Sequence, residues 1–459
     1  MKFVTAKTPL AVAVGLMVAT SVWAKVPANE AEQLGKELTC VGAIKAGNKE
    51  GTIPEFTGKW VGAPTGVAHV QSSGKHPVDI YADEKPIAVI TAENVDKYGD
   101  KLSYGQKAMF KKYPKTMQIQ VYKGHRDFRY TDEVCAVAKK NALESEVSPD
   151  GNSIKGSMGA INFPIPKTGL EVVWNNLLPT RAYNEHIVRD MANVMSDGSI
   201  AWGRQENINL SLDNLPSNVG KPVEGVMAYS RTRVLAPERE KGGVTHSVEP
   251  VNFAKDKRLA WSYDPGTRRV RQVPEYGFDQ PMAGTGGKMT IDSDRLANGS
   301  PERYSWKLLG KKEMYIPANN FKIHQPTVKY ADLLKQGHAN PDFMRYELRR
   351  VWAVEGTLKE GFRHVYGKRV LFVDEDTGQA VASDMYDTRG QLWQHAFINY
   401  YYSPDIKAWH AGTSFYHDLN SGGYMGYNLF QERPKGPILN KGDLTPAMFT
   451  PEAARNVGN

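Results

Sequence analysis

The hydrophobic and polar positions divide the chain into three parts. Leu10 to Val22 is an almost continuous apolar run that follows two lysines, Lys2 and Lys7. This run is shorter than the about 20 residues that a membrane-spanning helix needs. A basic start, a short apolar run and a small residue before the cleavage point are typical of a secretory signal peptide. We therefore predict a signal peptide over residues 1–24, cleaved between Ala24 and Lys25, and a soluble mature chain exported to the periplasm.

Residues 25–153 combine short helical patterns with stretches rich in Gly and Pro. The clearest helix covers Thr131 to Leu143, because Thr131 is a suitable N-terminal cap and Asp132 and Glu133 favour the positive end of the helix dipole. Shorter helices are predicted over residues 28–38 and 92–114. We expect this helical and irregular N-terminal third to pack on the remainder of the chain.

From about Ile154 onwards, short runs of Val, Ile, Tyr, Trp and Thr alternate with polar turns, which is typical of antiparallel strands. The turn Asp264-Pro265-Gly266-Thr267 joins two of them as a hairpin. A helix is expected at Val328–Gln336 and another near the C-terminus. Strands are predicted over residues 259–263, 268–273, 303–316, 346–358, 369–373, 380–386 and 391–402.

This pattern predicts an α+β fold that is mainly β. Residues 154–459 are expected to form one large curved antiparallel sheet, a half-barrel, in one structural domain with residues 25–153. Such a sheet must bury one face against helices or around a ligand.

Charge and cysteine content change this picture only slightly. The chain has 58 Lys and Arg against 50 Asp and Glu, a net charge of +8, and the two signs are interspersed. This mild excess disfavours nucleic acid as a partner. The two cysteines, Cys40 and Cys135, are predicted to form one structural disulfide in an oxidising compartment, with two buried thiols as the alternative.

Searches for catalytic and metal-binding motifs find none. The sequence has no GxSxG, HExxH or Walker pattern. His410 and His417 are predicted to be surface or hydrogen-bonded residues, and Asp374-Glu375-Asp376 a charged hairpin loop and not a calcium site. We therefore predict a protein that is not an enzyme and has no metal or cofactor. A cleft that gathers His364, His395 or His410 with carboxylates would revive an enzymatic interpretation.

Aromatic and arginine side chains on the predicted strands are the candidate site residues. An apolar sheet face could bury an acyl chain, although each aromatic could equally fill a core. The candidate ligand-binding residues are Trp261, Tyr263, Trp306, Trp352 and Trp393. Candidates for contact with a head group or a partner are Arg268, Arg269 and Arg271, which could also be charges that protect a sheet edge.

Four motifs carry a resemblance to a known family: WSYDPGTRRVR from Trp261, WKLLGKKEMY from Trp306, RYELRRVW from Arg345 and YDTRGQLW from Tyr386. Together they closely resemble exported proteobacterial proteins grouped as domain of unknown function 1329, often labelled outer-membrane lipoprotein-sorting-like. The first motif is also distantly similar to the lipoprotein carriers LolA and LolB, which are half-barrels with an apolar cavity. The two cysteines depart from what the family leads us to expect.

This resemblance implies a soluble periplasmic binding or carrier protein for a lipid or other hydrophobic molecule. It further implies a transporter of the resistance-nodulation-division (RND) type and an outer-membrane protein as partners. The alternative is an adaptor of an envelope transport complex whose core is filled by its own side chains and holds no ligand.

Overall fold

The computed structural model describes residues 26–273 and 277–458. The predicted signal peptide and its cleavage point between Ala24 and Lys25 lie outside the described residues. Within the described ranges, every helix is too short or too polar to cross a bilayer.

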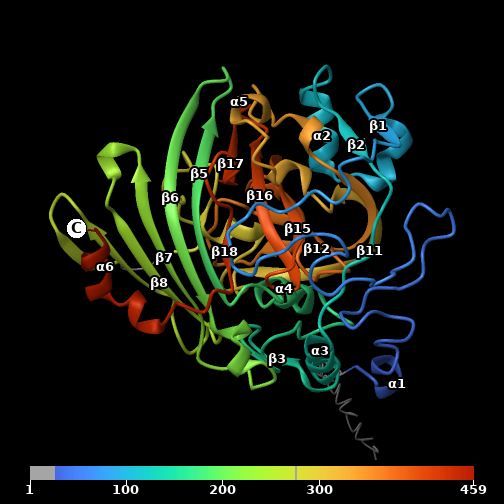
Figure 1. Ribbon diagram of the computed structural model, residues 1–459, viewed down its shortest axis with the longest axis horizontal. Coiled ribbons are helices and arrows are strands. Elements are labelled where there is room, and N and C mark those ends of the chain that lie inside the picture. The colour runs from blue at the N-terminus through green and yellow to red at the C-terminus, as the bar shows by residue number, and fades with distance from the viewer. Residues whose placement is uncertain (1–25, 274–276, 459) are drawn as a thin grey trace, which may run out of the picture.

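One large, open sheet organises the molecule (Figure 1). Its strands follow the order β1-β2-β12-β13-β14-β15-β16-β17-β5-β6-β7-β8-β9-β10, with β11 beside β12 and β18 beside β5. All its pairings are antiparallel except a parallel bridge between β2 and β12. The strands are β1 Ala88–Ile90, β2 Ile119–Val121, β5 Asn184–Val194, β6 Ile200–Ser211, β7 Val226–Ala236, β8 Val244–Pro250, β9 Leu259–Asp264, β10 Arg269–Gln272, β11 Tyr304–Pro317, β12 Tyr346–Leu358, β13 Lys368–Asp374, β14 Ala380–Tyr386, β15 Leu392–Ser403, β16 Ala408–Asp418, β17 Tyr424–Leu429 and β18 Ile438–Leu439. A separate pair is formed by β3 Glu146–Val147 and β4 Ile154–Lys155.

The predicted mainly-β fold with one large antiparallel sheet is confirmed, whereas the helical N-terminal third is not. Helices there are short, because Gly- and Pro-rich segments break the helical pattern between them. The helix expected at Val328–Gln336 is also reduced to a single turn, α5. The α-helices are α1 Ala28–Ala31, α2 Tyr104–Lys112, α3 Asp132–Glu144, α4 Gly169–Leu177, α5 Tyr330–Leu333 and α6 Pro451–Gly458. The 3₁₀ helices are η1 Val95–Lys101, η2 Leu212–Asn214, η3 Pro216–Asn218, η4 Glu238–Glu240, η5 Ile291–Leu296, η6 Lys322–His324, η7 Pro341–Phe343 and η8 Pro446–Phe449.

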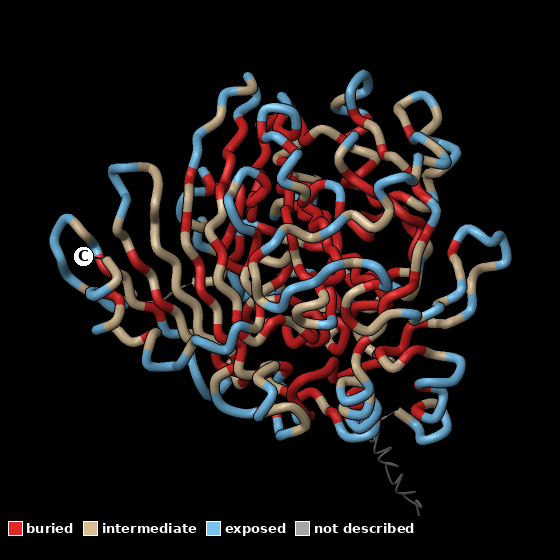
Figure 2. The backbone as a smooth tube through the Cα atoms, viewed as in Figure 1, coloured by how far each residue is buried: buried red, intermediate tan, exposed pale blue. Residues whose placement is uncertain are grey.

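The two halves of the sheet are buried to different degrees. Strands β12 to β17 are buried along most of their length, whereas β7 is largely half-buried and β6 alternates between buried and more accessible residues (Figure 2). Helix α4 covers β11 and β12, and helix α2 and η5 contact β14 and β15. The core therefore sits around β11 to β17, and β5 to β10 extend from it as a more open wing.

Helix α4 shows how the sequence fixes a covering element. Thr168 caps the helix by accepting a hydrogen bond from the Glu171 amide, and the Glu171 side chain accepts one in return from the Thr168 amide. Gly169 lies directly after this cap, where a Cβ atom would approach the backbone of Lys307 and Leu308 to 2.8 and 2.9 Å. The missing side chain therefore lets the helix pack onto β11 at backbone distance.

The predicted disulfide between Cys40 and Cys135 is confirmed. The two Cα atoms are 5.1 Å apart across 95 residues of sequence. Because Cys135 lies on α3, the bond fastens the irregular N-terminal segment to the longest helix of the described chain.

Candidate ligand-binding cavity

A cavity of about 320 Å³ lies between the open wing and the core. Strands β5 to β8 form one wall, and β15, β16 and the segment around η5 form the other. Cavities of this size bind small ligands in many proteins.

Cross-strand rows of side chains build the wall that the wing supplies. In one row, Glu185 on β5 pairs in register with Asn209 on β6, then Ser230 on β7 and Ser247 on β8. The neighbouring row includes Asn207, Thr232 and Thr245, and the Asn207 amide donates a 2.6 Å hydrogen bond to Thr232. Residues opposite one another in antiparallel strands share a face. The inner face of the wing is therefore largely polar, with Ile187 of β5 as the apolar member of the second row.

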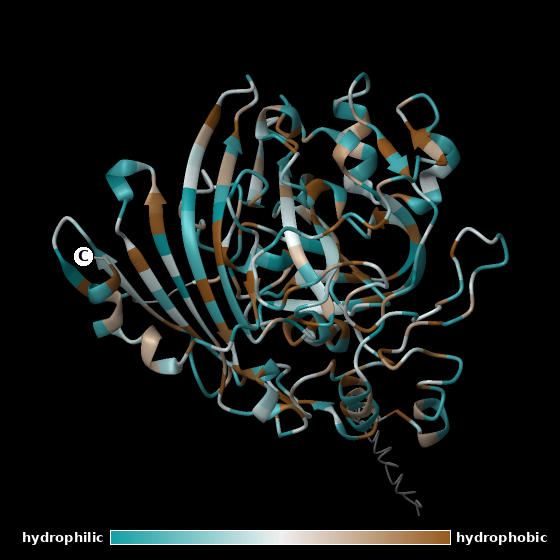
Figure 3. Cartoon of the chain, viewed as in Figure 1, coloured by the Kyte–Doolittle hydropathy of each residue, from teal (hydrophilic) through white to brown (hydrophobic). Residues whose placement is uncertain are grey.

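The opposite face of the same strands carries both apolar and charged side chains, and the hydropathy varies along them (Figure 3). Glu206 on this face forms ion pairs with His186, Arg231 and Arg233. Ile208 and Leu210 lie between the polar positions of β6 and pack against Phe449 of η8. The C-terminal segment thus covers the outer face of the wing, and the polar face is turned to the cavity. This arrangement differs from the apolar ligand-facing surface that the sequence suggested.

The cavity also contains apolar side chains. Met227 and Ile291 line it, together with Ile398, Trp409 and Tyr427 from the core side. Its lining is therefore amphiphilic.

Several buried polar atoms of the lining have no hydrogen-bond partner among the described residues. They are Nε of Arg181, Arg189 and Arg295, Oδ1 of Asn207 and Asn428, Oε1 of Glu249 and Nε2 of His410. Most buried polar groups in folded proteins are satisfied, so these atoms are available for hydrogen bonds with a molecule that enters the cavity.

Arg295 has the most unusual setting of these residues. It lies in η5 with φ of 54°, followed by Leu296 with φ of 67°, so two consecutive non-glycine residues adopt the left-handed conformation. Its Nη2 donates a 3.3 Å hydrogen bond to Gln379. Burial, reinforced by the nearby charge of Arg181, lowers the pKa of its guanidinium below the ordinary value.

His410 lies in the same cavity, with Nε2 3.5 Å from Glu185 Oε1. Burial lowers its pKa, and the attraction of Glu185 opposes that effect only in part. His410 is thus buried and neutral at pH 7. Of the two predicted alternatives, a surface or a hydrogen-bonded residue, the surface alternative is therefore wrong. His417 is also buried and stacks with Tyr424 at a ring distance of 5.2 Å.

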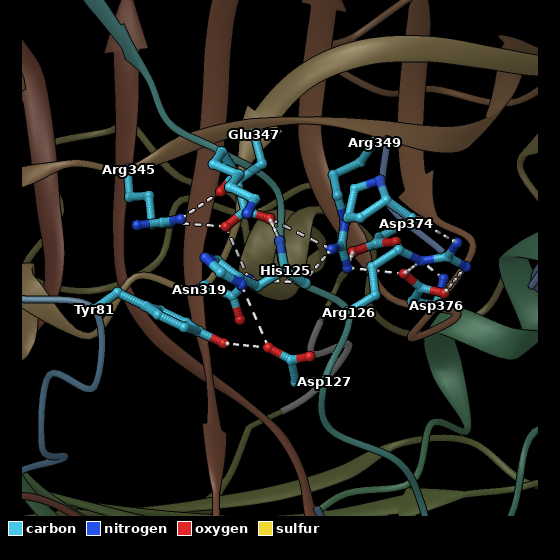
Figure 4. Close-up of polar contacts among 12 residues, drawn as sticks. Tyr81, His125, Arg126, Asp127, Asn319, Arg345, Glu347, Arg349, Asp374 and Asp376 are labelled. Atoms are coloured by element: carbon cyan, nitrogen blue, oxygen red, sulfur yellow. Dashed lines mark hydrogen bonds and ion pairs between the residues drawn. The ribbon is translucent and has the colours of Figure 1, made fainter. Parts of the chain in front are cut away.

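A second polar cluster, in contrast, is densely paired (Figure 4). Arg126 donates to both oxygens of Asp376, at 2.9 and 2.7 Å, and Arg349 reaches Asp376 at 2.9 Å. Arg345 Nε donates to Glu347 at 2.7 Å. This network joins the N-terminal region to β12 and to the β13–β14 hairpin. The network links these segments of the fold. Because its charged groups already form ion pairs with one another, few of them are available to bind a ligand.

The same network corrects the prediction for Asp374, Glu375 and Asp376. They do occupy a hairpin between β13 and β14, but all three are buried. Burial raises the pKa of Asp374 to about 6 despite the neighbouring Arg349 guanidinium. Sequence reasoning missed this site because the arginines that neutralise the hairpin come from distant segments.

The candidate aromatic residues are not brought together. Trp261 and Tyr263 share one face of β9, but the partners of β8 residues Thr245 and Ser247 are Ser262 and Ala260, so that face is opposite to the cavity. Tyr263 packs under α6 in a cluster with Ala454.

The other three lie on separate strands. Trp306 of β11 donates to the Pro301 carbonyl at 3.0 Å, Trp352 of β12 lies under Lys311, and Trp393 of β15 contacts Tyr366. None of the five lines the cavity, and a ligand role for them stays a prediction. Arg268, Arg269 and Arg271 are exposed at the β9–β10 hairpin, where a head-group or partner role is equally untested.

The three histidines of the enzymatic alternative occupy separate places. His364 contacts Asp292 at 3.1 Å, and His395 contacts Asp384 at 2.8 Å. Only His410 of the three lines the cavity. Across the described ranges, no group of three or more His, Cys, Asp or Glu side chains is arranged to hold a metal ion.

Sequence reasoning therefore missed most of the cavity. One signal was present in β6, where Asn207, Asn209 and Ser211 alternate with Ile208 and Leu210 and mark a polar inner face. Arg295 gives no such signal, because it lies outside any periodic segment.

A family model and a relative with similar sequence match most of the chain. The family model described as "Protein of unknown function (DUF1329)" matches residues 89–455. A protein of Pseudomonas aeruginosa described as uncharacterized is 41% identical over 452 residues, which is 96% of either chain.

Solved structures show more distant likeness. A DUF1329 family protein from Desulfovibrio piger is 14% identical, with a TM-score of 0.40 over 60% of this chain and 92% of that one. A LolA superfamily protein from Nitrosomonas europaea is 12% identical, with a TM-score of 0.37 over 62% of this chain and 98% of that one.

Proposed function

The chain belongs to the DUF1329 family, whose description assigns no function, and from its own site we propose that it is a binding or carrier protein for amphiphilic molecules. The observation that carries this proposal is the cavity between the wing and the core, with polar rows on one wall and apolar side chains among its lining. A ligand with both a polar and an apolar part matches both surfaces.

The unsatisfied polar atoms support a binding role over a solid core. Each buried donor or acceptor left without a partner costs about 1–3 kcal/mol. A bound molecule that pairs with them recovers part of that cost. The network around Arg349 also contains unsatisfied atoms, such as Arg349 Nε, but its charged groups form ion pairs with one another.

The cellular setting belongs to the same proposal. The N-terminal sequence supports export to the periplasm with cleavage after Ala24. The family resemblance supports an RND-type transporter and an outer-membrane protein as partners in moving the ligand.

Native mass spectrometry tests this function directly. The mature protein would be purified from the periplasm without detergent, and its mass compared with that of the same protein after solvent extraction. We expect a stoichiometric adduct of an amphiphilic molecule, which the extract then identifies.

A clean unliganded mass, repeated after incubation with a membrane extract, would contradict the carrier function. It would favour the adaptor alternative, in which the core of β12 to β17 serves as a rigid body for a protein partner.

A further inference from the structure

The arginines of the cavity fall into two groups. Arg181 donates to both oxygens of Asp213, at 3.0 and 3.1 Å, and Arg258 forms an ion pair with Glu249. Among the described residues, neither Arg189 nor Arg295 has a carboxylate within 4.0 Å. Arg189 lies over the Tyr427 ring at 4.4 Å, and Arg295 contacts Gln379.

The carboxylates of the cavity do not pair with these two arginines. Glu249 is paired with Arg258, and Glu185 accepts a 2.9 Å hydrogen bond from Asn209 and lies beside the neutral His410. Asp294 has no ion pair within 4.0 Å among the described residues. Arg189 and Arg295 therefore have no anionic group in contact, although Glu185 and Asp294 line the same cavity.

A guanidinium in this position keeps its charge at physiological pH. Arginine is effectively always protonated in proteins, so burial does not neutralise it as it neutralises His410. Arg295 is half-buried as a residue and its Nε atom is fully buried, and a charge withdrawn from water in this way is costly unless it is paired and hydrogen-bonded. An anion in the cavity would supply both to Arg295.

The backbone around Arg295 is a second, independent observation. Left-handed conformations at non-glycine residues persist only where the surrounding structure imposes them, and they cluster at ligand sites. Here Arg295 and Leu296 both adopt one, directly where the Arg295 side chain lines the cavity and Leu296 is fully buried.

We propose that the ligand of this cavity carries an anionic group, such as a carboxylate or a phosphate, which binds Arg295 with help from Arg189, while its apolar part lies along Ile398 and Trp409. This inference rests on the proposed function and deepens it by assigning the ligand's chemical class. The planar guanidinium can donate two parallel hydrogen bonds to either anion, which gives such pairs strength and direction.

Isothermal titration with matched ten-carbon probes tests the anionic group. Decanoate, decanol and decyltrimethylammonium, each below its micelle concentration, differ in head-group charge and share one chain. We expect the wild-type protein to bind decanoate at least about tenfold more tightly than the other two. Inorganic phosphate alone is expected to bind far more weakly than decanoate, because it has no chain to bury.

Substitutions then test which arginine binds the anionic head group. Arg295→Gln is expected to weaken decanoate binding by about tenfold or more and to leave decanol binding within about twofold. Arg189→Gln should show the same selectivity to a smaller extent, and it serves as the second variant if Arg295→Gln does not fold. Arg239→Gln, which changes an exposed arginine of η4 outside the cavity, is the matched control and should change neither.

The outcomes separate this inference from the proposed function. Equal affinity for all three probes, or an equal loss for all of them in Arg295→Gln, would overturn the anionic assignment while the binding function stands. If phosphate bound as tightly as decanoate, the apolar chain would contribute nothing, and the assignment of an amphiphilic ligand would be wrong. If no probe binds and native mass spectrometry shows no adduct, the proposed function itself fails.

Discussion

At the scale of single residues, charged side chains inside the molecule occur in two different settings. Around Glu347 and Asp376, cations and anions pair until the cluster is nearly saturated, and the result is a fastening. Around Arg295 the guanidinium has no ion pair, and we propose that it binds the anionic group of a ligand. The difference lies in the partners each side chain finds, because both clusters contain the same residue types.

His125 of the paired network gives a pH-dependent prediction. Burial would lower its pKa, but hydrogen bonds to Asp127 and to Glu84, at 2.6 Å, outweigh this and raise the pKa above 6.5. Its stabilising contribution is therefore complete below pH 6.5 and is lost as the pH rises through the raised pKa. We expect His125→Gln to lower the free energy of unfolding by about 1.5–3 kcal/mol at about pH 5.5 and by clearly less at about pH 9.

Urea unfolding of the wild type and of His125→Gln across this pH range measures the difference directly. Comparing the two proteins cancels the titration of the other groups that the variant leaves in place. A difference that stays constant from acid to alkaline pH would show that His125 stabilises the fold by packing on Tyr81 and not by its charge.

At the scale of elements, strands were predictable and short helices were not. The predicted bounds of 346–358 and 380–386 agree with β12 and β14, because alternation and polar turns are local signals. The helix predicted at Val328–Gln336 ends after one turn, since Leu334 instead bridges to Ala339 and the Tyr330 hydroxyl bonds to Asp190. Such tertiary contacts override helix propensity and leave no periodic trace.

Helix α4 offers a test at this scale. A Cβ atom at Gly169 would meet backbone atoms of β11 at 2.8–2.9 Å, and backbone cannot move aside as a flexible side chain can. We expect Gly169→Ala to lower the free energy of unfolding by about 1–3 kcal/mol in urea denaturation, although alanine favours helices.

The matched control is Gly99→Ala in η1, where the nearest atom to an added Cβ is the mobile Lys107 amine at 3.8 Å. This variant should stay within about 0.5 kcal/mol of the wild type. Equal effects of the two substitutions would mean that the close approach of α4 to β11 is not required.

At the scale of the whole molecule, the cavity could not have been predicted from sequence. Its lining extends from Arg181 to Asn428 and combines wing strands, core strands and the η5 segment. The class of fold followed from local patterns. That Arg295 and His410 line the same cavity depends instead on how the two halves of the sheet are placed against each other. The disulfide was predictable, because the chain has only two cysteines.

That disulfide fastens the N-terminal region to α3, and its removal should be measurable globally. It closes a segment of 95 residues, for which the chain-entropy model gives about 4.7 kcal/mol of stabilisation. We expect reduction to lower the urea midpoint of the wild type. A variant with both Cys40→Ser and Cys135→Ser should unfold at that lower midpoint and not respond to reductant. An unchanged midpoint on reduction would show that the charge network alone holds this region in place.

The pairing of β5 with β17 has a consequence for how the polypeptide reaches its native state. The wing can assemble from hairpins between neighbours in the sequence, and so can β11 to β17, but the seam between them joins Val194 to Tyr424. Strand β5, which is synthesised first in the wing, can therefore pair with β17 only after nearly the whole chain has been made. Contacts between residues so far apart in the sequence form slowly. Until the C-terminal strands emerge, the native sheet cannot be completed, so a chain in transit through a narrow translocation pore would still lack the interface that locks its two halves together.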